Sequence, residues 1–201
     1  MIDSAFAQPM LNVLRIAVWS DDIADSSIDR IRALFRSHGS DITACNWDPD
    51  AAAMPPLLAE LYRCWRDLAP PGGLPNLSQI TPMAVRPALG YVSLLDPVDG
   101  GTEFRYRLYG SAMAAISGFD LTGKLQSEAP VSAHLREFVI AIDRAVYRTG
   151  RPFYSCQRPG NARRVAAWHR LSLPLVNDQG AVARLLAVNL PLSATGQLLR
   201  I

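Results

Sequence analysis

Few residues of this chain have the type and spacing that catalysis requires. Only three histidines occur, His38, His134 and His169, and they lie far apart along the sequence. The three cysteines are also scattered and odd in number, so they predict neither a zinc knuckle nor a disulfide framework. The chain has no Gly-x-Ser-x-Gly elbow and no His-Glu-x-x-His motif. We therefore expect a protein that is not an enzyme and that holds no metal and no cofactor.

Of the single residues, His169 is the strongest candidate for a chemical role. It interrupts the apolar alternation of the run from Val165 to Val176, which predicts a strand with one buried face. A buried imidazole must find a hydrogen-bond partner or have its pKa lowered. Three roles remain open for His169. It could contact a polar group of a ligand, act as a general acid or base in a small enzyme, or form a hydrogen bond with a neighbouring residue in the core.

The composition is typical of a globular protein and shows neither a large net charge nor a membrane-spanning segment. The 201 residues are 49% hydrophobic and 19% charged, and a chain of this length buries about 70% of its surface on folding. A net charge of +2 gives no basic surface for nucleic acid. No run of 18 apolar residues is present to span a membrane, and no signal peptide is recognisable. We expect a cytoplasmic protein that binds neither nucleic acid nor membrane.

The elements that must position these residues divide into three segments. Residues 1–53 form an N-terminal extension, residues 54–73 a helix and linker, and residues 74–201 the main domain. In the extension, the apolar run Leu11–Trp19 predicts a strand, and the helical spacing between Ile28 and Phe35 predicts a helix.

The helix predicted at residues 55–69 carries a regular apolar stripe. Its spacing of three, four and three is that of an a/d seam and involves Leu58, Leu61, Trp65 and Leu68. Such a stripe packs either on its own domain or against a second copy of the chain. We expect a homodimer whose interface includes these four residues.

The main domain shows the pattern of an antiparallel α+β module. Two strands joined by a turn at Asp99-Gly100-Gly101 are followed by short helical segments and a long amphipathic helix ending before Gly150. Three more strands then complete a five-stranded antiparallel sheet with flanking helices.

Several stretches of this domain resemble the PAS-domain family, in particular the PAS-like family common in alphaproteobacteria. The resemblance covers residues 57–192 and rests on an ordered series of motifs: Leu74-Pro75, LGYVSLLD (89–96), FRYRLYG (104–110), GFDLTG (118–123), and RLSLPL (170–175) before the turn at 178–180. It implies a fold used for sensing and interaction rather than for a particular reaction.

The resemblance also implies a cavity between a curved sheet and its helices. We expect the inward-facing positions to bind a ligand, namely Tyr106, Leu108, Phe138, Ile142, His169, Leu171 and Leu186. The predicted function is a stand-alone sensory or regulatory module. It would bind a small ligand or a protein partner and signal to an unidentified protein by direct contact. The alternatives are a ligand-free interaction adaptor with a filled core and a small enzyme that uses the cavity.

Overall fold

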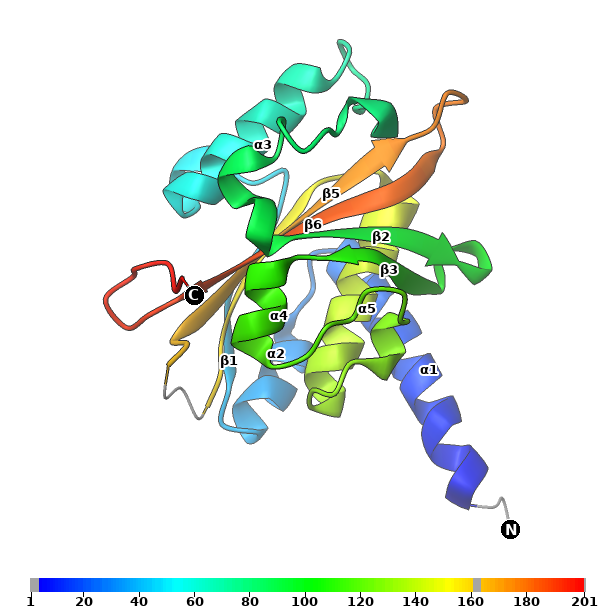
Figure 1. Cartoon of the computed structure of the whole chain (residues 1–201). Coiled ribbons are helices and arrows are strands. Elements are labelled where there is room, and N and C mark those ends of the chain that lie inside the picture. Colours follow the sequence, from blue (N-terminus) through cyan, green and yellow to red (C-terminus); the bar gives the residue numbers. More distant parts are fainter. Residues whose placement is uncertain (1–3, 161–163, 201) are drawn as a thin grey trace.

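The fold is built on one antiparallel sheet with helices on both faces (Figure 1). The computed structural model describes residues 4–160 and 164–200. The six strands have the order β1-β4-β5-β6-β2-β3, and every neighbouring pair is antiparallel. The strands are β1 (Asp41–Trp47), β2 (Val92–Val98), β3 (Glu103–Tyr109), β4 (Phe153–Arg158), β5 (Ala167–Val176) and β6 (Val182–Leu192). The predicted α+β class is confirmed, but the sheet has six strands instead of five.

The sixth strand comes from the N-terminal extension. β1 pairs with β4 from Asp41↔Arg158 to Trp47↔Phe153, at an edge of the sheet. The extension is therefore part of the same sheet as the residues that follow it. The helix α2 (Asp29–Ser37) lies before β1, where the apolar spacing predicted a helix.

The strand predicted at Leu11–Trp19 is wrong, because these residues lie within the helix α1 (Ser4–Ala24). A short, nearly continuous apolar run does not distinguish a strand from a buried helix. The helical form is held by long-range packing: Trp19 and Ile23, four residues apart, are both buried, and the Trp47 indole N–H donates to the Ile23 carbonyl at 2.7 Å.

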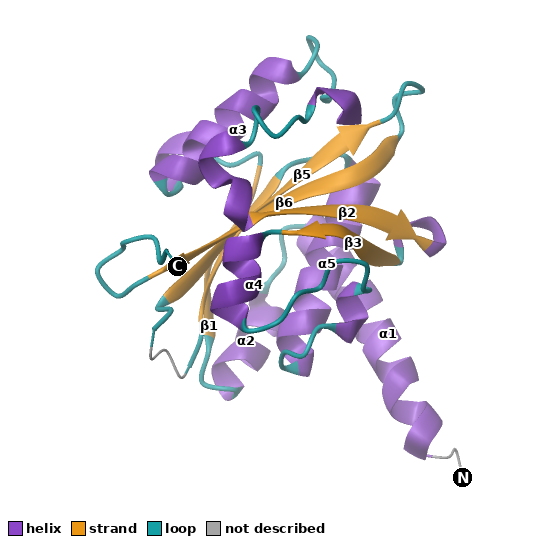
Figure 2. Ribbon diagram, viewed as in Figure 1, coloured by secondary structure: helices purple, strands orange, loops and turns teal. Residues whose placement is uncertain are grey.

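The helix α3 (Pro56–Leu68) covers one face of the sheet, on the side opposite to α4 (Ser111–Ser117) and α5 (Ala133–Thr149) (Figure 2). Leu58, Leu61 and Trp65 of the predicted seam are only 0–5% exposed in the single chain. The Trp65 indole N–H donates to the Pro174 carbonyl of β5 at 3.1 Å. Three of the four seam residues thus pack on their own domain.

Short 3-10 helices connect the main elements. They are η1 (Ala51–Ala53), η2 (Leu77–Gln79), η3 (Arg86–Tyr91), η4 (Asp99–Gly101) and η5 (Gln126–Glu128). In the described residues, no helix is both long enough and apolar enough to cross a membrane.

The faces of β5 are assigned by their contacts. Ser172 donates to the Asp143 carboxylate of α5 at 3.0 Å, so the even-numbered residues of the central part of β5 face α5. The odd-numbered residues, including His169 and Leu171, face the other side. Both sides are covered, and residues 170–175 are accordingly all buried.

Candidate functional site

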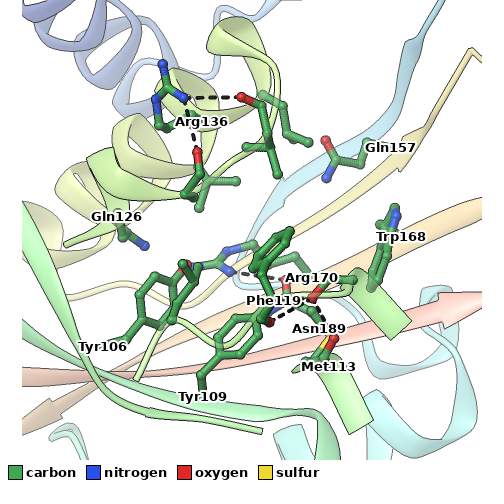
Figure 3. A pocket seen from close by; sticks show the side chains of 16 residues that line it. Tyr106, Tyr109, Met113, Phe119, Gln126, Arg136, Gln157, Trp168, Arg170 and Asn189 are labelled. Atoms are coloured by element: carbon green, nitrogen blue, oxygen red, sulfur yellow. Dashed lines mark hydrogen bonds between the residues drawn. The ribbon is translucent and has the colours of Figure 1, made fainter. Parts of the chain in front are cut away.

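A cavity of about 260 Å³ lies between the sheet and the helices α4 and α5 (Figure 3). The segment between α4 and α5 closes one side of it. Its wall combines apolar side chains with four aromatic rings and six polar side chains. The rings are Tyr106, Tyr109, Phe119 and Trp168, and the polar side chains are Ser117, Gln126, Arg136, Gln157, Arg170 and Asn189.

Arg170 is held in the wall by a buried ion pair with Asp143. The Nη2 of Arg170 lies 2.6 Å from Oδ2 of Asp143, and the two side chains are 5% and 0% exposed. Arg170 also donates to the Ser172 hydroxyl and to the Asn189 side-chain oxygen, each at 3.1 Å. Burial alone would lower the pKa of Arg170, but the Asp143 charge raises that pKa above its ordinary value. The pair is therefore charged, locally neutral and rigidly positioned.

Gln126 connects this ion pair to the cavity. Its Nε2 donates to Oδ2 of Asp143 at 2.6 Å, which fixes the orientation of the amide. The side-chain oxygen Oε1 is buried and has no hydrogen-bond partner, and the residue is 1% exposed. Buried polar atoms are nearly always hydrogen-bonded, so an orphan acceptor in a cavity wall indicates a place for a donor.

The two phenols of the wall remain neutral at physiological pH. Burial raises the pKa of Tyr106 and of Tyr109 above the ordinary value of 10.0. The Tyr109 and Phe119 rings are stacked with their centroids 6.2 Å apart, and the Tyr109 hydroxyl lies 3.4 Å from the Ser117 hydroxyl. The rings thus form a flat, apolar part of the wall.

Of the seven predicted ligand residues, all of which the structure describes, only Tyr106 lines the cavity. Leu108 is 39% exposed on the surface, and Phe138 packs against Phe35 of α2 with the ring centroids 5.1 Å apart. Ile142 is buried on α5 away from the wall. His169 and Leu171 lie on the opposite face of β5, and Leu186 lies with Leu61 and Trp65 of α3.

The difference between the predicted residues and the cavity wall has one main cause. The apolar alternation of β5 was taken to mark the inward face, whereas both faces of this strand are buried. Because side chains alternate, choosing the wrong face exchanges every residue for its neighbour. The residues that line the cavity, Trp168 and Arg170, are the immediate neighbours of His169. The signal that could have revealed them was the pair Arg170 and Ser172, two polar residues at a spacing of two in an apolar strand.

His169 lies in a hydrogen-bonded cluster on the other face. Its Nδ1 is 2.8 Å from the Tyr154 hydroxyl, and its Nε2 is 3.7 Å from the Cys156 sulfur. Burial lowers the pKa of His169, and the charge of Arg158 lowers it further. This arrangement corresponds to the structural role considered for this histidine.

A second pocket, of about 210 Å³, lies where the α2–β1 turn meets the start of α5. His38 and His134 face each other there with ring centroids 4.4 Å apart. Burial lowers the pKa of His134, and His38 adds to this effect. The described part of the chain contains no group of three or more metal-ligating side chains.

Comparison with known proteins identifies one family. A family model described as a PAS domain matches residues 54–189, about two thirds of the chain. The match begins at residue 54, directly after the segment interpreted as the N-terminal extension. Comparisons with curated proteins and with solved structures give no significant match.

Proposed function

The chain belongs to the PAS domain family, and from this premise we propose that it binds a small molecule in the cavity beside α5 and signals through protein contact. PAS domains are sensory and regulatory modules in general. The observation that carries the proposal is the orphan Gln126 acceptor in the wall of a 260 Å³ cavity. A filled core, which the adaptor alternative requires, would leave no such space beside the unpaired atom. In this proposal the cavity binds and does not catalyse.

The helix α5 is the element that would pass a signal outward. Its residues Arg136 and Val139 line the cavity, and the adjacent Glu137 is bound to Arg15 of α1 at 2.9 Å. At the other end of α5, Arg148 pairs with Asp21 of α1 at 2.6 Å. A ligand that favours one position of α5 over another would therefore change the position of α1.

The proposed partner of α1 is a second copy of the chain. Val13, Leu14 and Val18 are 62%, 59% and 43% exposed, while Trp19 and Ile23 on the same helix are buried. A helix that is apolar on both its buried and its exposed side normally has a partner on each. This face replaces the buried α3 stripe as the proposed dimer contact. The proposed location is the cytoplasm, which the three free cysteines of the described residues favour.

Native mass spectrometry of the purified full chain tests ligand binding. The expected result is extra mass under mild conditions that is lost on denaturation. Val139→Phe, which places a ring in the cavity, should abolish the extra mass while circular dichroism shows a retained fold. A matched control is Leu108→Phe on the exposed surface of β3, which should keep the ligand. A chain that carries no extra mass and binds no added small molecule would contradict the proposal and favour the adaptor.

A further inference from the structure

The described residues that line the cavity include one arginine whose positive charge no carboxylate balances. Two arginines line it, and the charge of Arg170 is neutralised by Asp143. Arg136 instead donates to the backbone carbonyls of Ala129 and Val131, each at 3.1 Å, and these acceptors carry no net charge. Among the described residues, no carboxylate forms an ion pair with Arg136. A half-buried guanidinium with only neutral acceptors favours an anion in the adjoining space.

The wall also contains two unpaired hydrogen-bond acceptors, the side-chain oxygens of Gln126 and Gln157, and Gln126 is the one bound to the ion pair. Figure 3 shows Arg136 and Gln126 apart from each other, with the Arg170 guanidinium near the middle of the group. The Gln126 side-chain oxygen can only accept a hydrogen bond, and the amide nitrogen already donates to Asp143. It can be satisfied by a hydroxyl or N–H of a ligand, and not by a carboxylate.

The space between these polar groups suits one aromatic ring. Tyr109 and Phe119 form a stacked pair in the wall, and Met113, Leu121 and Trp168 add apolar surface. A cavity of about 150 Å³ holds benzene. The larger volume of about 260 Å³ leaves room for substituents on a single ring.

We infer that the ligand is a monoanionic aromatic acid of one ring, with its carboxylate at Arg136 and a hydroxyl or N–H donor at Gln126. This inference rests on the proposed function, since it names the ligand class of the same cavity. Arg136 gives the preference for an acid over a neutral ring, and Gln126 gives the preference for a donor substituent.

Calorimetric titration of the ligand-free full chain tests this assignment, with 4-hydroxybenzoate, benzoate and benzyl alcohol as probes. We expect 4-hydroxybenzoate to bind most tightly and benzyl alcohol most weakly. Arg136→Gln should weaken both acids by about ten-fold or more and leave benzyl alcohol unchanged. Gln126→Leu should remove the preference for 4-hydroxybenzoate over benzoate. Arg107→Gln, at a guanidinium 60% exposed on β3, is the matched control and should change none of the affinities.

The outcomes separate the ligand class from the proposed function. Two outcomes would overturn the proposed ligand class and still leave the cavity as a binding site. One is equal affinity for the acids and for benzyl alcohol, and the other is acid binding that Arg136→Gln does not weaken. The same conclusion holds if no probe binds to a chain that carries a different small molecule in native mass spectrometry. A chain that binds no probe and carries no molecule would contradict the proposed function itself.

Discussion

At the scale of residues, the cavity depends on the ion pair between Asp143 and Arg170. Asp143→Asn removes the carboxylate that balances a guanidinium only 5% exposed. An uncompensated buried charge costs about 3–5 kcal/mol, so we expect the free energy of unfolding in urea to fall by that amount. Asp48→Asn is the control, because Asp48 and its partner Arg151 are 53% and 49% exposed and such pairs contribute about 1 kcal/mol or less. Similar losses for both variants would contradict the assigned role.

Two histidines make the stability of the fold sensitive to acid. Burial lowers the pKa of both His134 and His169 below the ordinary value of 6.5. Below pH 6.5 the unfolded chain therefore binds more protons than the folded chain. This contribution to stability is complete above pH 6.5 and is lost as the pH falls toward the lower, folded pKa.

Unfolding curves between pH 7.5 and pH 5.5 measure this effect. We expect the wild-type free energy of unfolding to decrease over this range, and His134→Gln and His169→Gln each to remove part of the decrease. Equal slopes for the wild type and both variants would show that the two imidazoles have ordinary pKa values in the folded chain.

At the scale of elements, the sequence predicted what local patterns determine. The order of strands and helices after residue 74, the turn at Asp99–Gly101 and the helix that became α5 all follow from alternation, helical spacing and glycine positions. Pairing between distant segments could not be predicted in this way. β1 joins the sheet through contacts with β4, more than 100 residues away, and α1 is helical because it packs along α5.

The candidate site was less predictable for the same reason. Asp143 and Arg170 come from α5 and β5, and no local signal indicates that they form a pair. Their types alone, a carboxylate in an apolar helix and a guanidinium in an apolar strand, indicate only that each needs a partner. Which face of β5 lies inward depends on what covers the sheet, and α3 covers the face that the alternation favoured.

The turn between β2 and β3 gives a test at this scale. Gly101 has φ +82°, and a Cβ added there would lie 2.2 Å from the Tyr147 ring of α5. Gly100, next to it, has φ +68° and open space around it. Gly100→Ala should cost about 1–2 kcal/mol for the left-handed backbone. Gly101→Ala should cost a further 1–3 kcal/mol or so, because the Tyr147 ring must move. Equal thermal unfolding temperatures for the two variants would show that the turn does not pack closely on α5.

At the scale of the whole molecule, α1 connects the cavity helix to the surface. Its C-terminal half is anchored, since Ile23 is fully buried and Asp21 is paired with Arg148 of α5. Its exposed apolar residues, Val13, Leu14 and Val18, lie on the exposed side of the same helix. In the proposed function, a signal that shifts α5 would therefore reach a surface available to another protein, without any rearrangement of the sheet.

Light scattering coupled to size-exclusion chromatography tests the proposed dimer. We expect Leu14→Glu to convert a dimer to a monomer without lowering the thermal unfolding temperature of the fold, because Leu14 is 59% exposed in the single chain. Met83→Glu is the control, since this residue is 72% exposed outside α1, and it should remain dimeric. A dimer that survives Leu14→Glu would place the contact elsewhere. If the wild type is monomeric at all concentrations, the proposed homodimer is wrong. α1 would then need a different protein as its partner to transmit the signal.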